Sequence, residues 1–430
     1  MSRPRVDLVA PPMSGHLHPL LGIGCRLARD VDVRVISTAA GQAEIAAAGL
    51  PGCALLAGAD QVISSIVNPP HAVRSYPWRL HAQFQANLAL FDRFRAELLA
   101  LWRESPPQLV IADFTLPVAG SAALERGIRW WTTVPSPCAI ETPDGPPGYL
   151  GGWKPWPGPA GRVRDAAGRA VVRAFKRGVH RLHRDTLRRL GFPAVYRPDG
   201  YEAMYSADRV LALGLAELEF PRRYPPAVEF VGPVLYTPPC DGAPPPFVAG
   251  REHVLVTIGT HLLWRKHAVA AAVRRAAREL PGIEFHFSDG NRASNRCESD
   301  GNVHRIGFVS YARDLSRYAV VVHHGGAGAL AHALAAGTPA LVLPVDYDQF
   351  DNAARLEVAG VGLRVHRLGD LARLIARALG DPEMRSRCRR MQALFAASRA
   401  EDRIAALVSD ALGRHAYPGR AADRLILSRP

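Results

Sequence analysis

Short runs of apolar, mostly β-branched residues alternate along this chain with longer segments whose apolar positions follow helical spacing. In the first half, helical stretches such as 17–29 and 81–103 separate runs at residues 6–10, 31–38, 108–114, 130–134 and 208–214. The second half repeats the scheme with runs at residues 253–259, 283–288, 303–309, 319–324 and 340–345. This alternation predicts two parallel sheets with helices on their faces.

A stretch rich in proline and glycine, "YTPPCDGAPPPFVAG" at residues 236–250, separates the two halves. Its composition disfavours regular structure and is typical of a linker. A chain of 430 residues with 48% apolar content can build two cores. We therefore predict two α/β domains that face a cleft: an N-terminal domain at 1–235, a linker at 236–250, a C-terminal domain at 251–412 and a tail at 413–430.

Composition and charge narrow the class of protein. The net charge is +14, carried almost entirely by arginine spread along the chain, and no nucleic-acid-binding module is recognisable, so nucleic acid is not an expected partner. The six cysteines are far apart and form no C-x-x-C pair, which argues against a zinc site or a disulfide framework. The chain enters a strand without a leader-like segment and has no run of about 18 apolar residues, so we expect a cytoplasmic, non-spanning protein.

Three predicted strands end in residues that carry chemistry, and ligands of such sheets bind beyond the carboxyl ends of the strands. The first strand is followed by "APPMSGHLHPLL" with His16 and His18, and the strand "VIADF" ends at Asp113. A carboxylate beside an imidazole fixes its tautomer and raises its basicity, so His16 and Asp113 could form a general base. The alternative is an ordinary loop histidine and a helix N-cap at Asp113.

The third strand end is "VVVHHGGAGALAHALAAG" at residues 320–337. Residues 320–322 are predicted as a buried strand and 329–336 as a helix, and Gly325, Gly326 and Gly328 let the turn between them approach another molecule closely. A helix start without bulky side chains offers backbone amides to an anion. The turn therefore predicts a phosphate site.

Two other kinds of site fit parts of the same sequence. The stretch "GAGALA" begins at Gly326 and includes Gly328, and Asp346 follows about 20 residues later. This spacing satisfies a dinucleotide fingerprint and would suit an NAD-dependent oxidoreductase. The "HLH" stretch, or Asp346 with Asp348, could instead provide metal ligands, although neither pair supplies enough of them.

Over nearly its whole length, the chain resembles nucleotide-sugar-dependent glycosyltransferases of the GT-B fold, the family of small-molecule glucosyltransferases and of macrolide, carotenoid and rhamnolipid glycosyltransferases. Four stretches in the same order carry the resemblance: "SGHLHPLL", "VIADF", "HHGGAGAL" and "PVDYDQFDNAARLEVAGVG". It implies two Rossmann-like domains, His16 as the base for the acceptor and Asp113 as its partner. It also implies sugar contacts at Asp348 and Gln349.

The resemblance also assigns the remaining donor contacts. The diphosphate motif corresponds to His324, Gly325, Gly326, Ala327, Gly328 and Ala329. By resemblance, Phe308 and Val309 lie against the nucleobase, and Asn352 and Glu357 lie in the region that closes around phosphate and ribose. Gly15 and Thr260 are further predicted donor contacts, with the Thr260 side chain expected at the diphosphate. Ala329 replaces a hydroxyl residue common in the family, and Phe308 replaces its usual tryptophan, which leaves the choice between uracil and thymine open.

The acceptor side is the least defined part of the sequence. A loop at 142–161 is rich in proline, glycine and aromatic residues, as expected of a segment that overhangs a site. Apolar acceptor contacts are predicted at Tyr149, Trp153, Trp156, Trp78 and Phe84. The alternative is that these side chains only pack the loop onto its domain.

A basic amphipathic helix is predicted next, at residues 162–190. One face carries Val163, Ala167, Ala170, Ala174, Val179 and Leu182, and the other carries Arg162, Arg169, Arg173, Arg177, Arg181 and Arg184. The favoured interpretation is a surface helix packed by its apolar stripe. The alternative is peripheral contact with the inner face of an anionic membrane, which would suit a lipid acceptor.

These observations predict an inverting, metal-independent hexosyltransferase without a cofactor. Its donor would be a UDP- or dTDP-sugar, and its acceptor a hydroxyl of a small, apolar natural product or lipid. The alternatives are an NAD-dependent oxidoreductase and a catalytically silent protein of the same fold that binds a sugar nucleotide or lipid.

Overall fold

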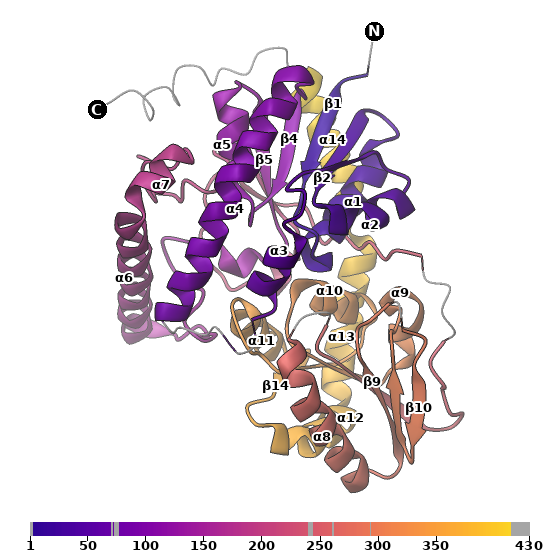
Figure 1. Ribbon diagram of the computed structural model, residues 1–430. Helices are drawn as coiled ribbons and strands as arrows, with labels where there is room; N and C mark the ends of the chain where they lie inside the picture. Colours follow the sequence, from indigo (N-terminus) through magenta and orange to yellow (C-terminus); the bar gives the residue numbers. More distant parts are fainter. Residues whose placement is uncertain are drawn as a thin grey trace.

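The computed structural model describes residues 3–69, 72, 77–239, 244–259, 262–292 and 294–413. Two lobes, each built on a seven-stranded sheet with helices around it, follow one another along the chain (Figure 1). The predicted α/β class with two Rossmann-like domains is confirmed. The predicted linker has no helix or strand at 236–239 or 244–248, and its residues 240–243 lie outside the described part.

The N-terminal sheet is entirely parallel, in the order β3-β2-β1-β4-β5-β6-β7. Its strands are β1 (Arg5–Val9), β2 (Asp32–Ser37), β3 (Gly52–Ala54), β4 (Leu109–Asp113), β5 (Arg129–Val134), β6 (Val210–Ala212) and β7 (Val228–Phe230). The five predicted strands are all present. The edge strands β3 and β7 have three residues each, too few for a periodic pattern in the sequence.

The C-terminal sheet has the order β10-β11-β9-β8-β12-β13-β14, and only β10 runs antiparallel to its neighbour. Its strands are β8 (Glu252–Thr257), β9 (Ile283–Ser288), β10 (Cys297–Asp300), β11 (Val303–Ile306), β12 (Val320–His323), β13 (Ala340–Val342) and β14 (Gly362–Arg364). In both sheets the carboxyl ends of the central strands bear the residues singled out in the sequence. Chain order reverses beside β1 and beside β8, which is where ligands of doubly wound folds bind.

Helices cover both sheets. Those of the N-terminal part are α1 (Ser14–Leu27), α2 (Gln42–Ala47), α3 (Asp60–Val67), α4 (Pro77–Glu104), α5 (Pro117–Glu125), α6 (Gly158–Leu182) and α7 (Arg184–Arg189). Those that follow are α8 (Leu263–Glu279), α9 (Tyr311–Asp314), α10 (Ala327–Ala335), α11 (Gln349–Ala359), α12 (Leu371–Leu379), α13 (Pro382–Ala397) and α14 (Ala400–Gly413). Short 3₁₀ helices lie at Ala39–Gly41, Pro137–Ala139, Ala216–Leu218, Leu315–Arg317 and Leu368–Asp370.

The last helix, α14, does not belong to the C-terminal core. Ala400, Ile404 and Val408 are buried in the same cluster as Leu17 and Leu20 of α1, and α14 lies beside the N-terminal sheet in Figure 1. The C-terminal domain therefore ends before residue 400, not at 412 as the sequence predicted. The reason is that the apolar face of α14 completes the N-terminal core, a long-range pairing without a local signature.

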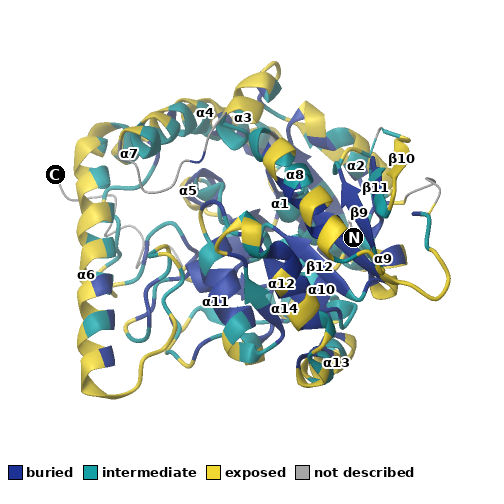
Figure 2. Cartoon of the chain, turned by 90° about the horizontal axis from the view of Figure 1, so that it is seen from below, coloured by how far each residue is buried: buried dark blue, intermediate teal, exposed yellow. Residues whose placement is uncertain are grey.

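Helix α6 differs from the prediction in its orientation. It runs along the edge of the molecule, and most of its surface is exposed (Figures 1 and 2). Its buried positions are Gly161, Asp165 and Gly168, whereas Val163 and Leu182 of the predicted apolar stripe are about two-thirds exposed, at 70% and 67%. The favoured interpretation of a helix packed by its apolar stripe was wrong.

Within the described residues, no helix is both long enough and apolar enough to span a membrane.

Candidate active site

The predicted base and its carboxylate partner are in contact. His16 lies in the first turn of α1, and its Nδ1 is 3.0 Å from Oδ2 and 3.1 Å from Oδ1 of Asp113, the last residue of β4. Asp113 is fully buried, whereas 26% of the His16 side chain is exposed. Asp113 also accepts hydrogen bonds from the backbone N–H and the hydroxyl of Thr115, which fix the carboxylate. The imidazole therefore donates from Nδ1 and keeps Nε2 as an acceptor.

The environment of His16 makes it more basic. Burial alone would lower its pKa, but the charge of Asp113, the hydrogen bond to it and the charge of Asp348 together raise the pKa above 6.5. Asp348 belongs to the C-terminal domain, so its influence means that the two domains bring these side chains close together. The interpretation of His16 as an unpartnered loop histidine is excluded by this geometry.

The glycine turn after β12 is shaped by its two histidines. His323 is completely buried, and its Nδ1 accepts a hydrogen bond from the N–H of Gly325 at 3.1 Å. Gly325 has a φ of 97°, in the left-handed region, and a Cβ there would lie 2.8 Å from Val342. A Cβ on Gly326 would lie 2.4 Å from Nε2 of His324. These glycines are thus required by the protein's own packing, with the His324 ring held over the turn.

Gly328 has different surroundings. Nothing lies within 4 Å of the position that its Cβ would take, and the same holds for Gly15 at the start of α1. Both glycines therefore border open space. Helix α10 begins at Ala327, so the amides of Ala327, Gly328 and Ala329 belong to its first turn and have no partner within the helix. This arrangement suits an anion.

Helix α11 contributes the residues matched to sugar contacts. Asp348 precedes the helix, and Gln349 opens it. The Oε1 atom of Gln349 accepts the N–H groups of Val345 at 2.8 Å and Asp346 at 3.1 Å, so a contact with a sugar hydroxyl falls to its Nε2. Asn352 donates to the carbonyl of Gly325 at 2.9 Å and to Asp348 at 3.3 Å, which ties α11 to the glycine turn.

Tyr347, which the motif comparison did not single out, is strained. Its φ of 56° is unusual for a bulky residue, and such strain clusters at functional sites. Its hydroxyl accepts a hydrogen bond from Gln83 of α4 at 2.7 Å, across the two domains. The strain sets the path of the chain between Asp346 and Asp348.

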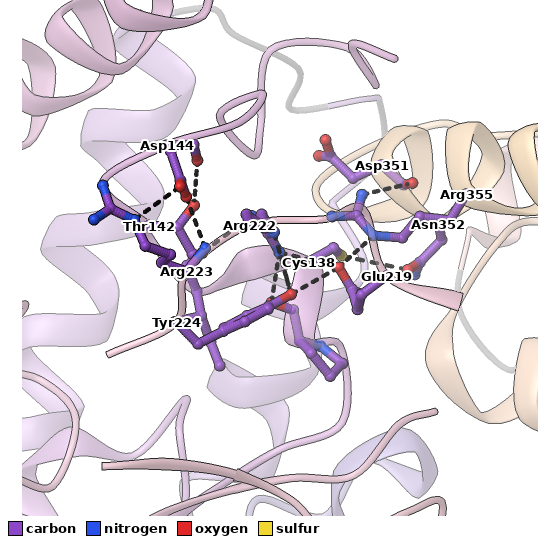
Figure 3. Close-up of polar contacts among 12 residues, drawn as sticks. Cys138, Thr142, Asp144, Glu219, Arg222, Arg223, Tyr224, Asp351, Asn352 and Arg355 are labelled. Atoms are coloured by element: carbon purple, nitrogen blue, oxygen red, sulfur yellow. Dashed lines mark hydrogen bonds and ion pairs between the residues drawn. The ribbon is translucent and has the colours of Figure 1, made fainter. Parts of the chain in front are cut away.

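A buried network joins α11 to the N-terminal domain (Figure 3). Arg355 pairs with Glu219 at 2.8 Å, and Arg222 holds the same carboxylate at 3.1 Å. Asp351 accepts the backbone N–H of Tyr149 at 2.8 Å, and burial raises its pKa to about 6 against the opposing effect of that hydrogen bond and of Arg355. Cys138 Sγ donates to Oδ1 of Asn352 at 3.4 Å. No motif signals these contacts, because their partners are far apart in sequence.

The positions matched to the nucleobase lie after β11. Phe308 is half-buried, with the Arg292 guanidinium 4.9 Å from its ring centroid. Val309 is 1% exposed and belongs to the C-terminal core, so only its backbone could contact a base. Arg292 also bonds the carbonyl of Pro238 at 3.1 Å. Thr260, predicted at the diphosphate, lies outside the described residues.

The loop predicted to overhang the site does contact the opposite domain. Lys154 pairs with Glu357 of α11 at 2.8 Å, so Glu357 lies against this loop. Its place near a ribose stays a prediction. Arg364 donates to the carbonyl of Gly151 at 2.9 Å. A Cβ on Gly152 would lie 2.2 Å from the carbonyl oxygen of Phe350, which shows how closely the backbones pass.

The predicted acceptor aromatics are spread over several surroundings. The Arg164 guanidinium lies 5.0 Å from Trp153 and 5.3 Å from Trp156, which places both rings against α6. Phe84 packs edge-on against His183 at 5.1 Å in a cluster under α4. The remaining two, Tyr149 and Trp78, are 39% and 65% exposed. A shared acceptor cavity stays a prediction.

The two histidines of the "HLH" stretch face different carboxylates, so they do not form a ligand pair. His18 Nε2 is 2.7 Å from Oε2 of Glu44, whereas His16 faces Asp113. Among the residues that the structure describes, no group of three or more histidine, cysteine or acidic side chains could hold a metal ion.

Comparison with known proteins agrees with this geometry. Residues 283–409 match the family model of the erythromycin biosynthesis protein CIII-like C-terminal domain. The chain is 29% identical over 317 residues to 4'-demethylrebeccamycin synthase of Lentzea aerocolonigenes, covering 70% of this chain and 73% of that protein.

Solved structures share the whole architecture. The glycotransferase of kitacinnamycin superposes with a TM-score of 0.73 at 21% identity, covering 96% of this chain and all of that one. The Streptomyces sp. SF2575 glycosyltransferase SsfS6, complexed with thymidine diphosphate, gives a TM-score of 0.64 at 19% identity, covering 95% of this chain and 99% of that one. The sequence similarity favours sugar transfer over NAD-dependent oxidation. The chain is thus a glycosyltransferase of the GT-B fold, similar to enzymes of antibiotic biosynthesis.

Proposed function

We propose that this enzyme transfers a hexose from a dTDP- or UDP-sugar to a hydroxyl of a small, apolar natural product, with inversion at the anomeric carbon and without a metal. The nucleotide is supported by the thymidine diphosphate complex of a protein with the same fold. The acceptor class is supported by the similarity to 4'-demethylrebeccamycin synthase. Lipid remains the second acceptor class.

His16 is the general base of the proposed reaction. Its Nδ1–H donates to Asp113, so the lone pair of Nε2 is free to take the proton of the acceptor hydroxyl. The hydroxyl oxygen then bonds to the anomeric carbon while the bond from that carbon to the diphosphate oxygen breaks. The proton stays on His16, whose positive charge Asp113 stabilises.

The leaving group departs toward the glycine turn. The electron pair of the broken bond goes to the diphosphate, whose added negative charge the first amides of α10 and the His324 side chain would stabilise. Because base and leaving group lie on opposite domains, attack comes from the face opposite the diphosphate. That geometry inverts the anomeric configuration. Charge stabilisation by amides and an imidazole also removes the need for a metal.

One observation carries this proposal: Nδ1 of His16 lies 3.0 Å from the buried carboxylate of Asp113, which leaves Nε2 as an acceptor for a proton. Helix α11, which Asp348 precedes, contacts the same domain through Asn352 and Cys138, so a residue that suits a sugar hydroxyl faces the domain that carries the base. A hexose held by Asp348 would present its anomeric carbon to an acceptor activated by His16.

Replacement of His16 tests the assignment. For His16→Ala we expect transfer to fall ~10²- to 10⁴-fold, the range for loss of a general base, while the affinity for dTDP changes less than about twofold. Product formation followed by mass spectrometry and dTDP binding by calorimetry measure the two effects. Unchanged transfer, or loss of both together, would contradict the role of His16. The exposed His366→Ala is the control and should leave both quantities unaltered.

The substrates follow from a screen of UDP- and dTDP-sugars against a pool of hydroxylated polyketides, aromatics and lipids. Transfer to an acceptor in the presence of a chelator supports the proposal. A strict requirement for Mg²⁺ would contradict its metal-free part. Donor binding without transfer to any acceptor, and without slow hydrolysis of the donor, would favour the silent binding protein.

A further inference from the structure

Apolar residues run along the outer surface of α6, interrupted by the exposed Arg177 and Arg181. Val163, Val171, Phe175 and Leu182 are 70%, 60%, 50% and 67% exposed. Ala166, Ala167, Ala170, Ala174 and Gly178 are exposed among them. Five of the fourteen large apolar side chains that are exposed in the described part of the chain lie on α6 or directly before it, at Trp156. Figure 2 shows this side of the helix turned away from the rest of the molecule.

The inner face of α6 is polar, which is the reverse of a typical surface helix. Lys176 pairs with Glu202 at 2.6 Å and with Glu141 at 3.1 Å, and Arg173 pairs with the same Glu141. Glu141 and Glu202 are nearly buried, at 9% and 5% side-chain exposure, so a rotation of the helix would leave two buried carboxylates without cations. The ion pairs therefore hold the apolar face outward.

The charge around this face is strongly positive. Arg162 and Arg181 are exposed on α6, and α7 adds the exposed residues Arg184, Arg188 and Arg189. Between residues 158 and 189 the acidic residues are Asp165, which is buried and paired with Arg164, and Asp185. An apolar strip flanked by arginines is complementary to a surface that is both apolar and anionic.

An aromatic residue marks one end of the strip. Trp156 is 55% exposed just before the first residue of α6, and its ring lies 5.3 Å from the Arg164 guanidinium. Indole rings are enriched where an apolar interior meets a polar headgroup layer. The helix itself is 25 residues long, or about 37 Å at 1.5 Å per residue.

We propose that the outer face of α6, with Trp156, docks this enzyme on an anionic lipid bilayer, with the helix parallel to the membrane plane. A second copy of the chain is disfavoured because two such faces would bring like charges together. A protein partner would need an acidic groove shaped to a 25-residue ridge, whereas a bilayer accepts a convex apolar ridge without one. The inference does not depend on the proposed substrates.

Vesicle sedimentation with the full chain tests the inference. We expect the enzyme to sediment with vesicles of phosphatidylglycerol and phosphatidylcholine, to bind pure phosphatidylcholine much more weakly, and to be released by high salt. Val171→Ser with Phe175→Ser removes apolar contact, and Arg162→Glu with Arg181→Glu reverses charge. Each pair should weaken vesicle binding about tenfold or more. For the arginine pair the reason is that each basic residue near an anionic surface raises the affinity about fivefold.

The matched control lies on α13, where Leu394 and Arg390 are also exposed. Leu394→Ser with Arg390→Glu should bind phosphatidylglycerol vesicles as the unaltered protein does, and thermal unfolding should show that every variant is folded. Absence of binding to anionic vesicles, or equal effects of the α6 and α13 variants, would overturn the proposal. A dimer that Phe175→Ser abolishes, without vesicle binding, would overturn it in favour of a second copy.

Discussion

At the scale of single residues, the protonation of His16 should set the pH dependence of transfer. Its pKa is raised because Asp113 and Asp348 outweigh the effect of burial. The base works only when neutral, so kcat/KM should rise with pH through a limb above pH 6.5 and then level off. Asp113→Asn removes the negative charge that contributes most to stabilising protonated His16. We expect the limb to move to lower pH in this variant while the plateau falls.

The rate against pH for both proteins, under subsaturating donor, measures this shift. A plateau that falls without movement of the limb would mean that Asp113 orients His16 but does not tune its pKa. Thr115→Val is a useful companion, because it removes a hydroxyl donor from Asp113 and keeps the carboxylate. It should move the limb far less than Asp113→Asn does.

Two neighbouring glycines should respond differently to the same methyl group. In Gly326→Ala the Cβ would lie 2.4 Å from His324, so the ring must move and we expect about 1–3 kcal/mol of destabilisation. In Gly328→Ala the Cβ enters open space, so stability should hold while dTDP affinity falls at least tenfold. Urea unfolding and calorimetry separate the effects. Gly369→Ala, which also meets open space, is the control, and dTDP binding by Gly328→Ala at full strength would contradict the diphosphate site.

At the scale of elements, three adjacent strands carry a row of buried histidines that should make the C-terminal sheet sensitive to acid. His286 of β9 packs edge-on against His253 of β8 and His304 of β11, at ring distances of 5.3 and 5.1 Å. Burial, then the charges of His304 and His253, lower the pKa of His286 to about 3. Glu284 bonds His304 at 2.8 Å, and the Tyr318 hydroxyl lies 2.8 Å from Nδ1 of His286.

A histidine whose pKa is lower in the folded state stabilises the protein above its unfolded pKa of 6.5, and this stability is lost as pH falls toward 3. For His286 the loss by pH 5 amounts to about 2 kcal/mol. His286→Phe should therefore lose about 2 kcal/mol less stability than the unaltered protein between pH 7.5 and 5. Urea unfolding at both pH values measures the difference. The exposed His366→Phe should not change it, and an equal loss in His286→Phe would contradict the assignment.

Most elements and the local motifs could be predicted from the sequence, because each depends on neighbours in the chain. The His16 turn, the strand end at Asp113 and the glycine turn combine strand periodicity with special residues at strand ends. The orientation of α6 could not be predicted. Its apolar stripe is the stronger local signal, yet ion pairs with Glu141 and Glu202, which lie outside the helix, decide which face is buried.

The second half of the site also depends on distant pairs. Cys138 with Asn352 and Glu219 with Arg355 join positions more than 130 residues apart, and neither pair has a sequence pattern. The strain at Tyr347 is equally invisible, because it arises where β13 must connect to α11. Sequence reasoning therefore found the residues proposed to act on substrates and missed those that position the two domains.

At the scale of the whole molecule, α11 is the element through which the domains are coupled. It carries Asp348 and Gln349 at its start and Arg355 two turns later. Arg355 is 3% exposed, bonds Glu219 of the N-terminal domain and lies 4.4 Å from the Phe220 ring. A change at Arg355 should therefore alter how Asp348 faces His16, although Arg355 has no predicted contact with either substrate.

Arg355→Met tests this coupling. Glu219 keeps Arg222 as a partner, so we expect destabilisation of about 2–3 kcal/mol, below the usual cost of stranding a buried charge. The KM for the donor sugar should rise severalfold, while dTDP, which does not need Asp348, should bind as before. Glu219→Gln combined with Arg355→Met should be less stable than Arg355→Met alone, because the buried Arg222 then lacks its carboxylate partner, and the donor KM should stay raised. If the single variant loses stability without a change in KM, the network only holds the domains together and does not position α11 for sugar binding.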